Sequence, residues 1–129
     1  EAAAFAKLLR RERRRKHGSL FMAAPEVENV SIDELKKGLA DGSILLVDVR
    51  EPNEYAAGRI PGATLNPLKR FDPMALPSVP GKRVVLSCRS GKRSLAALGL
   101  AQEAGRGDIR AHFPGGFQEW ANAGEKIET

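Results

Sequence analysis

The apolar run over residues 44–49 constrains the fold of this chain more than any other feature. It is continuous except for Asp48 and shows no alternation of apolar and polar residues. Such a run is typical of a strand that is covered on both faces of a sheet. A second apolar run, Val84–Leu86, predicts another strand, and stretches with helical character separate the strand candidates. Strands joined by helical crossovers form a mainly parallel sheet with helices on both faces, so we expect an α/β fold.

Local signals along the chain predict the remaining elements. Ser31 and Glu34 have the spacing of a capping box, in which a serine oxygen and a glutamate satisfy amides at the start of a helix. Pro52 suits the first turn of a short helix that ends at Gly58. We expect strands at 27–30, 44–49, 63–66, 83–87 and 109–113. We expect helices at 31–40, 52–58, 92–104 and 116–123, and a long irregular connection over 67–80 with one turn near 73–76.

Length and composition are those of a single globular domain. The chain has 129 residues, of which 42% are hydrophobic and 29% are charged. No apolar run approaches the roughly 18 residues that a membrane-spanning helix needs. The single cysteine cannot form an internal disulfide, which favours a reducing compartment such as the cytoplasm.

The positive charge of the chain is confined to its N-terminal part. Residues 1–22 contain seven basic and two acidic side chains, whereas residues 23–129 contain 14 of each. We therefore divide the chain into a basic extension, residues 1–22, and one domain, residues 23–129, which we do not expect to bind nucleic acid. We interpret the extension as a tag or linker remnant ahead of Met22 or as a solvated tail. The alternatives are a helix that binds a membrane surface or nucleic acid and a mitochondrial presequence, which Glu1 and Glu12 disfavour.

Cys88 directly follows the second apolar strand candidate and opens the cysteine loop, defined here as residues 88–94. A thiolate is the nucleophilic form of cysteine, and a free cysteine with a pKa of about 8.5 is mostly protonated at neutral pH. Loop amides, the positive end of the following helix and the guanidinium groups of Arg89 and Arg93 would stabilise a thiolate at Cys88. The other interpretation is that Cys88 is a small buried apolar residue.

These considerations give one candidate nucleophile, Cys88, and a set of candidate substrate-binding residues. That set is Arg89, Ser90, Gly91, Lys92, Arg93, Ser94, Asp48 and Arg50. Two interpretations stay open for Asp48 and Arg50, which lie either at the mouth of the site or in a structural ion pair. Lys92 and Arg93, at the start of a helix, either contact the anion or point into solvent. We interpret His112 as a buried histidine with satisfied hydrogen bonds, because no second metal-binding residue lies near it in the sequence.

Four motifs follow one another along the chain, at residues 48–51, 58–63, 88–94 and 115–120. With these motifs the chain resembles a single-domain rhodanese over residues 27–127. The resemblance implies a five-stranded parallel sheet flanked by helices, a thiosulfate sulfurtransferase-like activity and a persulfide on Cys88. Two residues differ from the usual pattern of the family, Arg59, where histidine is common, and Pro114, beside the double glycine. We expect both differences to affect local packing or substrate preference.

Loop length separates sulfur transfer from phosphate chemistry. By resemblance, the same fold serves cell-cycle dual-specificity phosphatases and some arsenate reductases, whose loops are one residue longer than the four residues between Cys88 and Arg93 here. A shorter loop fits a sulfur atom better than a tetrahedral phosphate. A further alternative is a binding or regulatory module without turnover, but such domains usually lack the cysteine that this chain retains.

The expected reaction needs two separate small molecules or proteins. Cys88 would take the outer sulfur of a small anionic donor such as thiosulfate and pass it to cyanide or a thiol. Because the chain has no second cysteine, the acceptor is a different molecule, such as glutathione, a thioredoxin-like protein or a sulfur-carrier protein. We expect no cofactor, no metal and no membrane contact, and a monomer or weak dimer.

Overall fold

The computed structural model describes residues 25–129, so the basic extension lies outside the described residues. Its centre is a parallel sheet with the strand order β1-β5-β4-β2-β3. The strands are β1 (Glu28–Asn29), β2 (Ile44–Asp48), β3 (Thr64–Leu65), β4 (Arg83–Ser87) and β5 (Ala111–Phe113). The helices are α2 (Ile32–Asp41), α3 (Pro52–Ala57), α4 (Lys92–Glu103) and α5 (Gly116–Asn122), with two 3-10 helices, η1 (Leu68–Arg70) and η2 (Pro73–Ala75).

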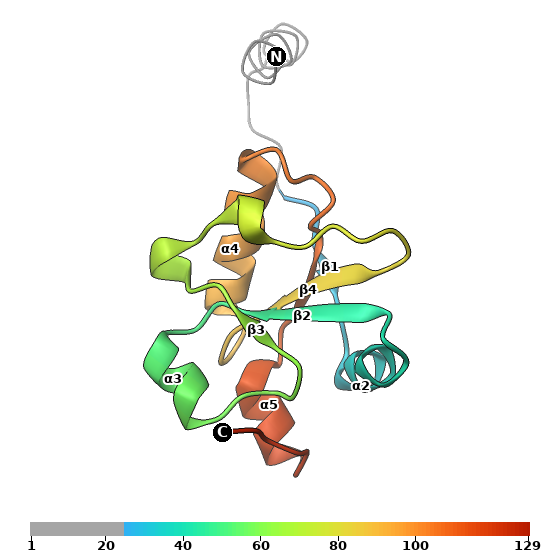
Figure 1. Cartoon of the computed structure of the whole chain (residues 1–129), viewed down its shortest axis with the longest axis vertical. Coiled ribbons are helices and arrows are strands. Elements are labelled where there is room, and N and C mark those ends of the chain that lie inside the picture. Colours follow the sequence, from blue (N-terminus) through green and yellow to red (C-terminus); the bar gives the residue numbers. More distant parts are fainter. Residues whose placement is uncertain (1–24) are drawn as a thin grey trace, which may run out of the picture.

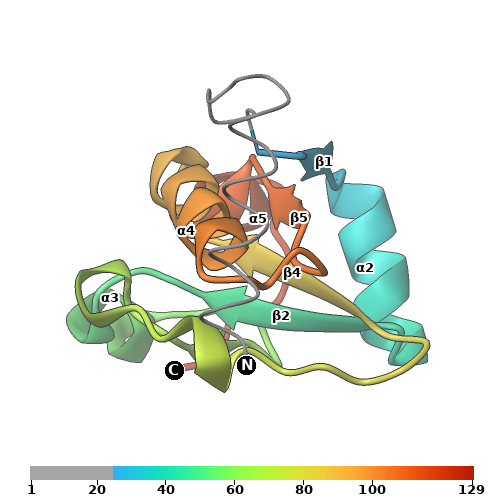
Figure 2. The same ribbon diagram turned by 90° about the horizontal axis from the view of Figure 1, so that it is seen from above.

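Helices cover both faces of the sheet, as predicted. Figure 1 shows α4 on one side of β2 and β4, and α2 and α5 on the other side; Figure 2 shows the same layers from above. Leu46 and Val85 belong to the core under α2 and α5, whereas Val47 and Leu86 belong to the core under α4. The apolar runs lack alternation because neighbouring residues of one strand enter opposite cores. Within residues 25–129, no helix combines the length and apolar character needed to cross a bilayer.

Local sequence signals predict the helix ends well, but they predict the short strands and the long connection less well. The capping box at Ser31 and the helix stop at Gly58 are confirmed. β1, β3 and β5 have two, two and three residues and are shorter than predicted, because the ladder pairs of these strands extend over only those residues. The connection after β3 contains η1 in addition to the predicted turn. The Asn66 side chain braces this segment through hydrogen bonds of 2.9 and 3.0 Å with the backbone of Asp72.

Candidate functional site

Cys88 directly follows β4, the central strand of the sheet, and its side chain is 1% exposed. The neighbouring strands end at the same level, since Asp48 of β2 and Phe113 of β5 both pair with Ser87. In parallel α/β sheets, reactive groups gather at the carboxyl ends of the strands. The candidate nucleophile therefore lies at the edge of the sheet where the sequence predicted it.

Backbone amides of the cysteine loop surround the sulfur of Cys88. The amide of Gly91 donates to Sγ at 3.1 Å and the amide of Ser94 at 3.3 Å, while the Ser94 hydroxyl oxygen lies 3.6 Å from Sγ. Burial raises the pKa of the Cys88 thiol, but these hydrogen bonds, together with one from Ser90, lower the pKa further than burial raises it. The site therefore stabilises the thiolate relative to that of an ordinary cysteine, although the sulfur is buried.

The start of α4 supplies part of this amide ring. Ser94 is the third residue of α4, and its amide belongs to the first turn, where no intrahelical acceptor is available. Gly91 precedes the helix with φ +96°, a conformation that residues other than glycine rarely adopt. A side chain at Gly91 would also place its Cβ 2.6 Å from the Pro114 carbonyl oxygen. The glycine is therefore needed both for the turn and for close packing against Pro114.

The start of α5 fixes the orientation of the cysteine loop. The Phe117 amide donates to the Cys88 carbonyl at 2.8 Å, and the Gln118 amide donates to the Arg89 carbonyl at 3.1 Å. The C=O and N–H of a trans peptide point in opposite directions. Holding these two carbonyls against α5 therefore turns the following amides away from α5, and the Ser90 amide is one of those that hydrogen-bond to the sulfur. This role of the double-glycine motif was missed in the sequence, where the motif had no assigned function.

Asp48 and Arg50 form a buried ion pair rather than a contact for substrate. Arg50 is 3% exposed, and its Nη2 donates to Asp48 Oδ2 at 2.8 Å and to the Gly58 carbonyl at 2.7 Å. Its guanidinium also lies 4.4 Å from the centre of the Phe117 ring. Of the two interpretations of Asp48 and Arg50, the structure gives the buried ion pair. Arg50 joins the segment after β2 to α5, which in turn holds the cysteine loop.

Arg93 binds a carboxylate of α3 rather than the sulfur. Its Nη1 and Nη2 atoms donate to the two carboxylate oxygens of Glu54 at 2.7 and 3.1 Å. These hydrogen bonds lower the pKa of Glu54 to about 2 and raise the pKa of Arg93. The Arg93 guanidinium is therefore held by Glu54 and is linked to Cys88 by charge rather than by a hydrogen bond. Glu54 is a residue that the sequence analysis missed, because nothing in its local pattern indicates a partner 39 positions away.

The remaining polar side chains of the cysteine loop face outward. Arg89, Ser90 and Lys92 are exposed, whereas Gly91 and Ser94 are buried. The loop thus separates into buried groups that contact the sulfur and exposed cations at the rim. Of the two interpretations of Lys92, the structure gives the exposed one.

Ser94 also contacts His112, which lies on β5 next to β4. The Ser94 Oγ is 2.8 Å from His112 Nδ1, and His112 Nε2 is 3.2 Å from Asn29 Oδ1 on β1. Both ring nitrogens therefore have partners within the protein, as predicted for a satisfied buried histidine. Burial lowers the pKa of His112, which favours the neutral imidazole.

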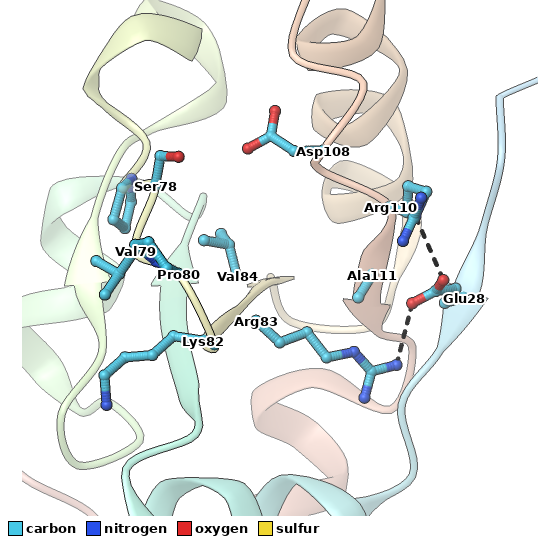
Figure 3. A pocket seen from close by; sticks show the side chains of 12 residues that line it. Glu28, Ser78, Val79, Pro80, Lys82, Arg83, Val84, Asp108, Arg110 and Ala111 are labelled. Atoms are coloured by element: carbon cyan, nitrogen blue, oxygen red, sulfur yellow. Dashed lines mark hydrogen bonds and ion pairs between the residues drawn. The ribbon is translucent and has the colours of Figure 1, made fainter.

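A surface hollow of about 410 Å³ lies at the other end of the sheet (Figure 3). It is lined at the starts of β1, β4 and β5, where Arg83 and Arg110 share the carboxylate of Glu28 at 3.2 and 3.4 Å. Cys88 follows the opposite end of β4 and is not among the residues that line the hollow. The hollow is therefore separate from the thiol and its amide ring.

Comparison with known proteins places the chain in a family. The family model of the Rhodanese-like domain matches residues 31–123. A sulfurtransferase of Allochromatium vinosum is 37% identical over 103 residues, which cover 78% of this chain and 94% of that protein. The human thiosulfate:glutathione sulfurtransferase is 35% identical over 105 residues, which cover 70% of this chain and 90% of that protein. An uncharacterized Synechocystis protein is 39% identical over 105 residues, which cover 80% of this chain and 58% of that protein.

Solved structures agree with this placement. A human single-domain sulfurtransferase superposes with a TM-score of 0.62 at 34% identity, covering 73% of this chain and 95% of that chain. A rhodanese-related protein of Thermoplasma volcanium superposes with a TM-score of 0.66 at 25% identity, covering 78% and 97%. Sheet order, a cysteine at the end of the central strand and these matches agree with one another. The chain belongs to the rhodanese-like domain family.

Proposed function

We propose that this protein is a sulfurtransferase that moves sulfane sulfur from thiosulfate or a related anionic donor to a thiol acceptor or cyanide through a persulfide on Cys88. The observation that carries the proposal is the pair of amide hydrogen bonds, from Gly91 at 3.1 Å and Ser94 at 3.3 Å, that hold the Cys88 sulfur. The names of the A. vinosum and human relatives support the same reaction class.

The reaction proceeds in two displacements at one residue. The Cys88 thiolate attacks the outer sulfur of thiosulfate, the S–S bond of the donor breaks, and sulfite leaves with the bonding electron pair. An acceptor thiolate then attacks the terminal sulfur of the persulfide, which releases a hydropersulfide and restores the Cys88 thiolate. With cyanide as the acceptor, the product is thiocyanate. Fixed amide dipoles stabilise the negative sulfur in both states, so the loop needs little reorganisation between the two steps.

The exposed cations of the cysteine loop favour an anionic sulfur donor. The exposed cations Arg89 and Lys92 attract a sulfonate-like group by long-range electrostatics, while the buried groups receive the transferred sulfur. The acceptor is a separate molecule, because Cys88 is the only cysteine of the chain. Glutathione is the first candidate, since the human and yeast relatives are named thiosulfate:glutathione sulfurtransferases; a thioredoxin-like or sulfur-carrier protein is the alternative.

Two features disfavour phosphate chemistry at this site. Four residues lie between Cys88 and Arg93, which makes a small loop, and both guanidinium Nη atoms of Arg93 are bound to Glu54. An arginine that clamps a phosphate presents these same donors to the substrate. A phosphatase would therefore have to break the Arg93–Glu54 pair at each turnover.

Mass spectrometry of the intact protein tests the proposal directly. Incubation with thiosulfate should add the mass of one sulfur atom, cyanide should remove it, and Cys88→Ser should abolish the addition. Steady-state rates with thiosulfate, mercaptopyruvate and persulfide donors, each paired with cyanide or glutathione, then define the substrates. An unchanged mass with every donor would overturn the proposal and favour a binding module, whereas hydrolysis of an aryl phosphate by the wild type but not by Cys88→Ser would favour a phosphatase.

A further inference from the structure

A continuous chain of polar groups leads from the buried sulfur to the edge of the sheet. It passes from Cys88 Sγ to Ser94 Oγ over 3.6 Å, from Ser94 Oγ to His112 Nδ1 over 2.8 Å, and from His112 Nε2 to Asn29 Oδ1 over 3.2 Å. Cys88, Ser94 and His112 are buried, whereas Asn29 lies on the short edge strand β1 and is exposed. The contact between Ser94 and the sulfur belongs to the site already described, but the contacts of Ser94 with His112 and of His112 with Asn29 have no role in the reaction as described so far.

The positions of the hydrogens in this chain follow from its end groups. Asn29 Oδ1 is an acceptor, so the hydrogen of the neutral imidazole lies on Nε2 and the lone pair lies on Nδ1. The Ser94 hydroxyl has one hydrogen, and its shortest contact is with that lone pair. Because the Ser94 hydroxyl donates this hydrogen bond to His112, the Ser94 oxygen can accept a hydrogen bond from the Cys88 thiol.

We infer that Ser94 and His112 form a proton relay that withdraws the proton of the Cys88 thiol into the protein. The S–H bond of Cys88 breaks and its proton binds Ser94 Oγ, while the original hydroxyl proton of Ser94 moves to Nδ1 of His112. The bonding electron pair stays on the sulfur. The products are a thiolate that accepts a hydrogen bond from Ser94 and an imidazolium that donates one to Ser94, so the net charge of the chain of groups does not change.

The surroundings of His112 leave it free to act as this base. The hydrogen-bond partners of the ring are the neutral Ser94 of α4 and the neutral Asn29 of β1, and its paired neighbour in β4 is the apolar Leu86. The charged residues that open α4 are Lys92, which is exposed, and Arg93, which is paired with Glu54. Cys88 is therefore the titratable group to which His112 is linked. Burial lowers the pKa of His112 and so opposes the imidazolium, and the negative charge of the Cys88 thiolate has to offset this cost.

The use of this relay in sulfur transfer rests on the proposed function, but the relay itself can be tested without a sulfur donor. The rate of alkylation of Cys88 by iodoacetamide, measured as a function of pH, reports the thiolate fraction. His112→Asn retains an amide near Ser94 but cannot accept a proton. At pH values below the alkylation midpoint, we expect the thiolate fraction of this variant to be about tenfold lower than that of the wild type. The midpoint should therefore move up by about one pH unit.

Asn29→Asp tests the relay from the other end and lies on an exposed edge strand, so it carries little risk for folding. A carboxylate that accepts from His112 Nε2 stabilises the imidazolium. The relay therefore predicts a lower alkylation midpoint, whereas direct repulsion between the new charge and the thiolate would raise it. Asn122→Asp, an exposed site at the end of α5, is the matched control for the change in net charge and should leave the midpoint unchanged.

Ser94→Ala removes the bridge and decides between the relay and a separate effect of His112. The relay predicts that Ser94→Ala and the double variant Ser94→Ala/His112→Asn have the same midpoint. A wild-type midpoint in folded His112→Asn, an unchanged or raised midpoint in Asn29→Asp, or additive shifts in the double variant would each overturn the inference. Failure of the wild type to take up sulfur from thiosulfate would overturn the proposed function alone, because alkylation needs no donor.

Discussion

Replacing Gly116 by alanine should uncouple the cysteine loop from α5. Gly116 has φ +63°, and a Cβ placed there would lie 2.3 Å from the Arg89 carbonyl oxygen and 2.6 Å from the Cys88 carbonyl oxygen. Atoms at these distances cannot remain in place, so the loop and the helix must move apart. The hydrogen bonds from Phe117 and Gln118 to these carbonyls, at 2.8 and 3.1 Å, lie at the point of contact.

The expected loss in free energy of unfolding of Gly116→Ala has three separate contributions. The left-handed backbone conformation costs alanine about 1 kcal/mol relative to glycine. Loss of two hydrogen bonds at about 1 kcal/mol each and an overpacking cost of about 1 to 2 kcal/mol raise the expected loss in free energy of unfolding to about 4 to 5 kcal/mol. Gly124→Ala is the matched control, since Gly124 has φ +75° and no atom lies within 4 Å of the place that a Cβ would occupy. It should lose only the first contribution, about 1 kcal/mol.

Urea unfolding of both variants measures these free energies, and alkylation of Cys88 in the folded fraction measures the state of the sulfur. In Gly116→Ala the amides of the loop should no longer converge on the thiol, so the alkylation midpoint should rise, whereas Gly124→Ala should keep the wild-type midpoint. Equal losses of stability in the two variants, or a wild-type midpoint in Gly116→Ala, would refute the conclusion that α5 orients the loop.

Three further predictions concern the charged groups. The pKa of Glu54 is about 2 in the folded protein, below its unfolded value. After allowance for solvent screening, this group should stabilise the fold by about 1 kcal/mol at neutral pH, and this stabilisation should be lost as the pH falls from about 5 to about 2. Glu54→Gln should remove that pH dependence in urea titrations. Asp48→Ala should cost about 3 to 5 kcal/mol in thermal or urea unfolding, because it leaves the buried Arg50 charge unpaired, and Asp48→Leu/Arg50→Met should recover most of the loss. Arg89→Ala and Lys92→Ala should each raise the thiosulfate concentration for half-maximal rate severalfold and weaken its dependence on ionic strength, and an unchanged salt dependence would exclude steering by the rim.

The architecture was predictable because its determinants are local. The unbroken apolar character of residues 44–49, the capping box at Ser31 and the stop at Gly58 each act within a few residues of the chain. β4 was predicted with its observed bounds, since the apolar run is followed directly by the polar cysteine loop. The position of Cys88 at the end of a strand was likewise readable, and with it the participation of the loop amides.

The directions of the charged side chains were not predictable, because they depend on partners far away in the sequence. Arg93 faces Glu54 on α3, and Arg50 is held by the Gly58 carbonyl and the Phe117 ring as well as by nearby Asp48. A cluster of cations beside a nucleophile indicates an anion site, but it does not show which cations are neutralised within the fold. The link between Ser94 and His112 crosses from α4 to β5, and no local pattern announces such a contact.

The dependence of the cysteine loop on α5 has a consequence for the newly made protein. During synthesis, Cys88 leaves the ribosome before β5 and α5 do, so its carbonyl and that of Arg89 have not yet met their partners in α5. Until the C-terminal helix docks, the nascent thiol has the reactivity of an ordinary cysteine. We therefore expect the Cys88 thiol to gain its lowered pKa only once α5 has docked on the cysteine loop.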